Sequence, residues 1–227
     1  MKSFKTAFFA FLLTSFSLFA SAQTGALKGK KATLHNYMFA IDESFQMNLE
    51  DLLEEDPVTH LPDYNEVEAL FKGKTYERIE AASESHTGLE ILPVDALQGK
   101  VLYDVYDFPA GSRKKAAKAG DTPYYLKLNV QMMPRDVAQD ELEVNSTSME
   151  KRRIKPIITI KATMANKKGK SLYTVTGKAK GDRWITLEQV SLWGFIHIEG
   201  QDIIDEENTL MSVLDEAIED LKANWLK

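Results

Sequence analysis

Cysteine is absent from the 227 residues of this chain. Its absence excludes disulfides, thiolate metal sites, cysteine nucleophiles and the acylated cysteine that anchors a bacterial lipoprotein. The fold must therefore depend on its hydrophobic core, and a chain of this length can bury a sizeable one. Basic residues are fewer than acidic ones: the chain has 28 Lys and Arg and 34 Asp and Glu, for a net charge of −6. This balance argues against nucleic acid as the main partner, since nucleic-acid binders usually carry a basic footprint.

Signatures of catalysis and metal binding are missing as well. The histidines are far apart in the sequence, and no cluster supplies the three protein ligands of a catalytic zinc. A nucleophile elbow, a P-loop and a dinucleotide fingerprint are all absent. We therefore expect no metal, no cofactor and no enzyme activity, with a hydrolase assembled from distant residues as the weaker alternative.

One long apolar run occurs, at the N-terminus. Lys2 and Lys5 precede the apolar residues 7–19, and Ala20-Ser21-Ala22 forms a small-residue cleavage site. This pattern predicts a cleaved signal peptide at residues 1–22 and a periplasmic or secreted protein that begins at Gln23. No later run approaches the ~20 apolar residues of a membrane helix. We therefore expect no transmembrane segment after cleavage.

The remaining chain predicts a flexible leader at residues 23–35 and one domain at residues 36–227. Residues 134–153 are polar and lack periodicity, so they are expected to form a loop or a disordered excursion. The expected earlier elements are strands at Tyr37–Ile41, Leu89–Val94 and Val101–Phe108 and a helix over Tyr64–Ala82 that Gly73 interrupts.

The second half of the chain carries the clearest patterns. Residues 124–133 alternate apolar and polar side chains, and two further strands at 156–164 and 171–179 flank a turn at Gly169. Apolar residues at helical spacing run from Leu210 to Trp225. The predicted fold class is α+β: a mixed sheet with a central hairpin, flanked by helices and closed by a C-terminal amphipathic helix.

A candidate ligand site lies at the strand region 190–199. If this region is one strand, Trp193, Phe195 and His197 point to one side, and Val190 and Leu192 point to the other. Because both faces are largely apolar, the strand is expected to be covered on both sides. The alternative is an aromatic face that binds an apolar small molecule, which would make the protein a periplasmic carrier.

A candidate partner site is the basic cluster Arg113, Lys114, Lys115 and Lys118. It lies within residues 109–123, a predicted loop flanked by Gly and Pro. The cluster is either a solvated loop or an electrostatic contact for an anionic surface or an acidic envelope protein.

The order of these elements resembles exported α/β domains related to the TolB N-terminal domain. That group includes the curli-secretion lipoproteins and the periplasmic activators of penicillin-binding proteins. The hairpin turn Lys168-Gly169-Lys170 and the closing helix Leu210–Trp225 are among the matching pieces. The resemblance implies a non-enzymatic envelope protein that binds a partner or assists assembly, and it supplies no catalytic residues. Members of the group are usually anchored through a cysteine, which this chain lacks.

Overall fold

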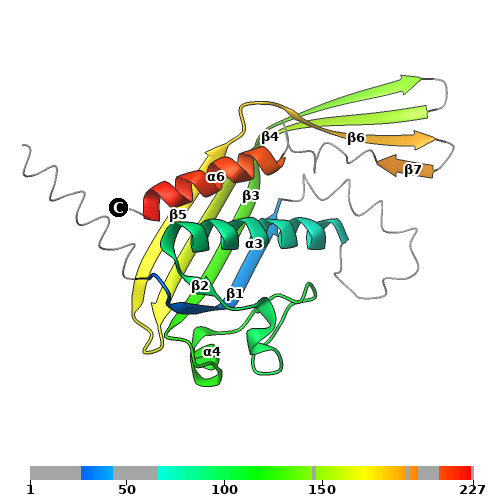
Figure 1. Ribbon diagram of the computed structural model, residues 1–227. Helices are drawn as coiled ribbons and strands as arrows, with labels where there is room; N and C mark the ends of the chain where they lie inside the picture. The colour runs from blue at the N-terminus through cyan, green and yellow to red at the C-terminus, as the bar shows by residue number, and fades with distance from the viewer. Residues whose placement is uncertain (1–26, 43–65, 145–146, 193–194, 199–209, 226–227) are drawn as a thin grey trace, which may run out of the picture.

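The computed structural model describes residues 27–42, 66–144, 147–192, 195–198 and 210–225. A mixed sheet has the strand order β2-β1-β3-β4-β6-β7, and β5 also pairs with β4. Two long helices, α3 and α6, lie on one face of this sheet (Figure 1). The predicted α+β class with a C-terminal helix is confirmed. The signal peptide predicted at residues 1–22 lies outside the described residues.

The sheet mixes parallel and antiparallel pairs. β1 is parallel to β2 and β3, and the other pairs are antiparallel. The strands are β1 Lys31–Ile41, β2 Glu90–Ile91, β3 Tyr124–Val144, β4 Thr147–Asn166, β5 Ser171–Lys180, β6 Ile185–Leu192 and β7 Phe195–Ile198. The helices are α3 Glu66–Thr87, α4 Arg113–Ala119, α6 Leu210–Trp225 and the short 3-10 helix η1 Val94–Leu97.

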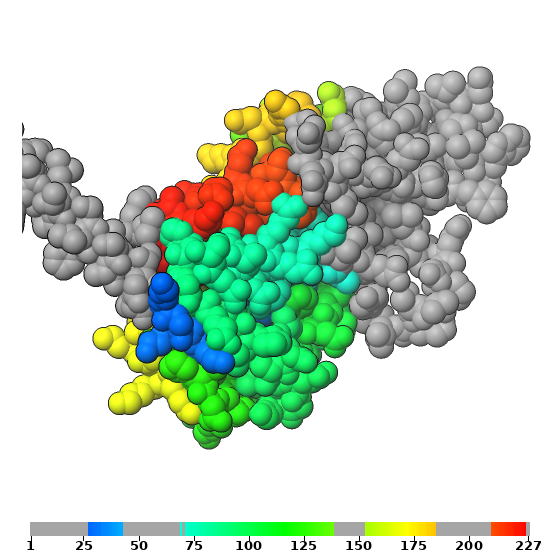
Figure 2. Space-filling model, viewed as in Figure 1, coloured from blue at the N-terminus to red at the C-terminus, as the bar shows by residue number. Residues whose placement is uncertain are grey.

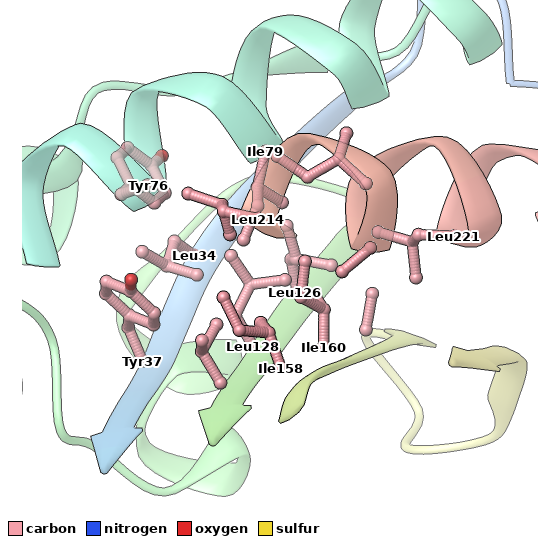
Figure 3. Close-up of a cluster of buried hydrophobic side chains, with 14 of the residues drawn as sticks. Leu34, Tyr37, Tyr76, Ile79, Leu126, Leu128, Ile158, Ile160, Leu214 and Leu221 are labelled. Carbon is pink, nitrogen blue, oxygen red and sulfur yellow. The ribbon is translucent and has the colours of Figure 1, made fainter. Parts of the chain in front are cut away.

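Alternation of side chains along β3 and β4 builds the core. Every second residue of each strand is buried beneath the helices: Leu126, Leu128, Val130 and Met132 on β3, and Ile158, Ile160, Ala162 and Met164 on β4. Figure 3 shows several of them packed with Ile79 of α3 and Leu214 of α6. The turn of the β4–β5 hairpin uses Gly169 at φ 97°, a conformation that glycine adopts without steric cost. The predicted hairpin is confirmed.

Helix α6 packs directly on β5 through a glycine. A Cβ on Gly177 would lie 2.1 Å from the carbonyl O of Ala217, so only glycine allows this approach. The predicted apolar stripe is buried: Leu210, Leu214, Ala217, Ile218, Leu221 and Trp225. In the space-filling view from the helix side, α3 and α6 cover this face of the sheet (Figure 2).

Helix α6 also covers the backbone edge of β5. The carboxylate of Asp220 accepts the backbone N–H of Lys178 at 2.9 Å, and the side-chain amide of Asn224 donates to the carbonyl O of Thr176 at 2.9 Å. An uncovered strand edge can pair with another chain. These two bonds therefore protect the edge of β5.

The first strand starts earlier than expected. β1 begins at Lys31, and Leu27 is already buried. The flexible leader predicted for residues 23–35 is therefore wrong over its second half. Thr33 and His35 are buried on the face opposite the helices. Because these buried residues are polar, the sequence lacks the apolar alternation by which a strand is predicted.

Residues 134–144 and 147–153 are strand rather than loop, which corrects the predicted excursion over the described residues. They belong to the outer parts of β3 and β4, which with β6 and β7 form an antiparallel extension that we call the arm. At its base Pro134 faces Pro156, and β4 exchanges its partner β5 for β6. Asp136 faces Lys155 in the register, and opposite charges on facing strands stabilise such pairs without an apolar pattern. Figure 1 shows the arm extending beyond the helices.

Three other elements differ from expectation. α3 continues through Gly73, and β2 contains only Glu90 and Ile91. Residues 101–108 form a loop with one isolated bridge, from Tyr103 to Pro109, instead of a strand. Tyr106 and Phe108 pack inward around a buried cation of α3, whereas Tyr103 packs beside Leu97, so these residues do not alternate as in a strand.

That cation is Lys72, which pairs with Asp104 inside an aromatic cluster. The Lys72 side chain is 5% exposed, and its Nζ lies 5.0 Å from the ring centre of Tyr106 and 5.4 Å from that of Phe108. The other oxygen of Asp104, Oδ1, accepts the backbone N–H groups of Tyr106 and Phe108, each at 3.0 Å. A buried charge needs such pairing and hydrogen bonding. The pair fixes the loop against α3.

Candidate interaction surface

The basic cluster lies on a short helix, not in a loop as predicted. Ser112 precedes α4, and its Oγ accepts the backbone N–H of Lys115 at 3.4 Å. Ala116 and Ala117 are buried against Leu97 and the ring of Tyr125. Because the alanines face the sheet, the cationic residues of the other helix face are turned outward, and Lys114, Lys115 and Lys118 are exposed.

A second basic segment meets this helix. Gly169, in the β4–β5 turn, lies so close to Arg113 that a Cβ there would be 2.3 Å from the guanidinium Nη1. Lys167 Nζ donates to the carbonyl O of Gly120 at 3.2 Å, and it lies 3.8 Å from the carboxylate of Asp121. Figure 1 places α4 and this turn at the same end of the sheet. We call this surface the basic end: Arg113, Lys114, Lys115, Lys118, Lys167, Lys168 and Lys170.

The loop that precedes α4 carries exposed apolar side chains. Leu102 is 68% exposed and Val105 is 43% exposed, the former being the most exposed large apolar residue in the described part of the chain. The carbonyl O of Leu102 accepts the backbone N–H of Ala110 at 2.8 Å, shortly before α4 begins. Cations beside exposed apolar groups are the combination found on proteins that bind at membrane surfaces.

The face of the sheet opposite the helices carries a line of lysines. Register places Lys127 beside Thr163, Lys161 beside Asn129, and Lys178 beside Thr159. Lys180 lies two residues beyond Lys178 on β5, so it is on the same face, and it pairs with Ile157. We call these four residues, Lys127, Lys161, Lys178 and Lys180, the lysine stripe. Within the described residues, none of them forms an ion pair with a carboxylate.

Most carboxylates of α3 and α6 belong to the helix layer, and Asp220 lies at the edge of β5, where it accepts the backbone N–H of Lys178. Helix α6 carries Asp215, Glu216, Glu219 and Asp220, and α3 carries Glu77, Glu80 and Glu84. Some of them pair locally, as Asp215 does with Arg78 and Glu219 does with Lys222. Although the chain is acidic overall, its sheet side and its basic end are cationic. Such segregated charge attracts an oppositely charged partner and orients its approach.

A buried histidine lies beneath the basic end. His35 is 5% exposed, and its Nδ1 is 3.2 Å from the carbonyl O of Gly111, so Nδ1 carries the hydrogen. Burial lowers the pKa of His35 below its ordinary value, and the nearby charges of Lys127 and Arg113 lower it further. The imidazole is thus held neutral where the loop before α4 joins β1.

The aromatic candidate site rests on a strand arrangement that the structure does not have. The chain reverses between β6 and β7, so that Phe195 faces Leu192 and His197 faces Val190. Directly paired residues lie on the same face of a sheet, so the expected placement of Val190 and Leu192 on the face opposite Phe195 and His197 is wrong. Trp193 lies outside the described residues. A ligand-binding role for Trp193, Phe195 and His197 stays a prediction.

Two negative findings apply to the described part of the chain. Those residues contain no group of three or more His, Cys, Asp or Glu side chains that could hold a metal ion. They also contain no helix with the length and apolar character needed to cross a membrane.

Comparisons with known proteins give likeness at the level of the fold. No family model matches the chain, and no curated protein matches it. Among solved structures it is similar to a lipoprotein of Neisseria meningitidis, with 12% identity and a TM-score of 0.39 over 86% of this chain and 99% of the other.

Two further solved structures show comparable likeness. One is a neuraminyllactose-binding hemagglutinin homolog of Helicobacter pylori, with 10% identity and a TM-score of 0.35 over 88% of this chain and 85% of the other. The other is a protein of Chlamydia trachomatis, with 10% identity and a TM-score of 0.33 over 86% of this chain and 97% of the other. None of the three is described as related to TolB, so that resemblance stays a prediction.

Proposed function

We propose that this chain is a non-enzymatic, exported binding protein of the cell envelope that attaches to an anionic lipid surface through its basic end. The observation that carries the proposal is the meeting of two basic segments, at α4 and at the β4–β5 turn, in an otherwise acidic protein. Export rests on the signal-peptide pattern of residues 1–22.

The basic end has both components of peripheral membrane binding. Its cations attract anionic headgroups, at about 1 kcal/mol per Lys or Arg near the surface. Leu102 and Val105 supply apolar side chains that can enter the boundary between headgroups and acyl chains. The acidic side chains of α6 belong to the helix layer, and the carboxylate of Asp121 beside α4 lies 3.8 Å from the ammonium group of Lys167.

Vesicle co-sedimentation tests the proposal. The full chain should bind vesicles that contain phosphatidylglycerol, and binding should weaken as salt rises and the Debye length falls from ~10 Å at 0.1 M to ~3 Å at 1 M. Lys114→Glu/Lys115→Glu should abolish most of this binding at low salt. Because both side chains are exposed, the unfolding midpoint should stay close to that of the wild type.

Leu102→Ser separates the apolar contribution from the charge. It should weaken vesicle binding at every salt concentration, since the apolar contact is not screened. The matched charge control is Lys74→Glu/Lys222→Glu, which makes the same charge change on the two helices. Equal binding by the α4 variant and the wild type would refute the proposal. So would capture of acidic polypeptide, with no binding to the vesicles.

A further inference from the structure

The lysine stripe is a surface apart from the basic end, and it has a regular geometry. Neighbouring strands are about 4.8 Å apart and two residues along a strand span about 6.7 Å, so a step of one strand and two residues measures about 8 Å. Lys127 on β3, Lys161 on β4 and Lys178 on β5 are related by two such steps. Lys180 continues the line, for a total of about 20 Å across three strands.

Between Lys127 and Lys178 the residues around the stripe are uncharged and polar, whereas at its other end Ile157 faces Lys180 and Met133 faces Ile157. Asn129, Gln131, Thr159, Thr163, Thr174 and Thr176 occupy the neighbouring outward positions on the same three strands. Their hydroxyl and amide groups donate and accept hydrogen bonds, whereas the ammonium groups of the lysines only donate. The surface thus offers evenly spaced positive charge with neutral hydrogen-bonding groups between the charges.

This pattern fits one class of partner better than the others. A peptide normally adds to a sheet through a free strand edge, and the edge of β5 is covered by Asp220 and Asn224 of α6. A lipid surface favours apolar side chains among the cations, but the positions between Lys127 and Lys178 are polar. An acidic polysaccharide carries both repeated carboxylates and many hydroxyl groups.

We infer that the lysine stripe binds a linear acidic polysaccharide, laid diagonally across β3, β4 and β5. The carboxylates of the polymer pair with the four ammonium groups, and its hydroxyls bond with the threonine, asparagine and glutamine side chains. The sugar chain runs from the region of α4 toward the arm. This site uses no residue of the basic end, so it does not depend on attachment to lipid.

The test is binding of the full chain to polygalacturonate, a polymer with a carboxylate on each sugar, measured by titration calorimetry. Lys161→Gln/Lys178→Gln should weaken binding about tenfold, since it removes two charge pairs of the strength seen at exposed sites. The salt dependence should also become less steep, because fewer ion contacts form. With galacturonate oligomers, affinity should rise until the oligomer spans the stripe and then level off.

The control variant removes the same amount of charge from the helix layer. Lys74→Gln/Lys222→Gln should bind polygalacturonate as the wild type does. Unfolding midpoints of both variants should match the wild type, which separates loss of binding from loss of folding. Dextran, a neutral polymer, should not bind.

Three outcomes would overturn the inference. The first is polygalacturonate binding that the stripe variant retains in full. The second is tighter binding of polyglutamate than of polygalacturonate, which would assign the surface to an acidic polypeptide. The third is a stripe variant that loses vesicle binding and keeps polysaccharide binding. The α4 variant Lys114→Glu/Lys115→Glu should keep most of its polygalacturonate affinity, so failure of the lipid proposal and failure of this inference are distinguishable.

Discussion

The two faces of the same sheet differ in almost every physical respect. Along β4, Ile158, Ile160 and Ala162 are buried beneath α3 and α6, while Thr159 and Lys161 between them face the other way. One face is apolar and covered by helices that carry carboxylates. The other is polar and cationic, and beyond α4 none of the described helices covers it. Successive residues of one strand therefore alternate between the hydrophobic core and the proposed binding surface.

This division has a consequence for mutation. Substitutions on the covered face should change stability, whereas substitutions on the open face should change binding and leave stability intact. The loop at residues 101–108 and the residues before α4 are surface elements that buried polar groups hold in place. Asp104 of the loop pairs with Lys72, and His35 bonds with Gly111. The expected losses of unfolding free energy are largest at the buried ion pair and smallest at the surface.

The largest effect is expected at the buried pair of Lys72 and Asp104. Asp104→Ala leaves the ammonium group of Lys72 buried without its partner, which should cost about 3–5 kcal/mol of unfolding free energy. Denaturant unfolding at neutral pH measures this loss. A small change would mean that Lys72 turns to solvent and that the pair does not hold the loop.

Ile160 and Lys161 are adjacent residues that test the two faces directly. Ile160 is fully buried, so Ile160→Ala should cost about 2–5 kcal/mol. Lys161→Ala, on the exposed side, should stay within about 0.5 kcal/mol of the wild type. Denaturant midpoints of both variants check the pair. Similar losses at the two positions would contradict the assignment of faces.

Gly177 tests how closely α6 must approach the sheet. Gly177→Ala places a methyl group against the backbone of α6, which should cost about 1–3 kcal/mol through overpacking. Gly73→Ala is the matched control, because no atom lies near its added Cβ and helix propensity favours alanine by up to about 1 kcal/mol. Thermal unfolding should therefore move in opposite directions for the two variants.

His35 predicts a smaller, pH-dependent effect. Because burial lowers the pKa of His35 in the folded protein, its neutral form favours folding at pH above the ordinary value of 6.5. Stability from this group should fall as pH decreases from 6.5 toward the folded pKa. His35→Asn should remove this part of the dependence while other groups continue to titrate. Unfolding curves of both proteins across this pH range measure the difference, and parallel curves would exclude the histidine as the cause.

Much of the core could be predicted from sequence because its patterns are local. Alternation identified β3 through Met132 and the β4–β5 hairpin, and helical spacing identified α6. The arm was missed because its facing residues, such as Asp136 and Lys155, are complementary only after the strands are paired. The 7-residue helix α4 was missed because just two alanines, Ala116 and Ala117, mark its buried side.

The basic surface was half visible in the sequence. The residues from Arg113 to Lys118 form a run of cations that the sequence shows directly, whereas the lysines around Gly169 indicate only a hairpin turn. Their meeting at Gly169 depends on tertiary packing that no local pattern records. The lysine stripe could have been found by reading the polar positions of the alternating strands, since Lys161 and Lys178 occupy the outward half of the same pattern.

Hydrogen exchange of the full chain, with and without vesicles that contain phosphatidylglycerol, can locate the surface that binds lipid. If the basic end binds lipid, the amides of α4 and of the β4–β5 turn around Gly169 should exchange more slowly on vesicles, and those of α6 should be unchanged. Slower exchange confined to α6, with no change at α4 or the turn, would show that lipid binds the helix layer and not the basic end.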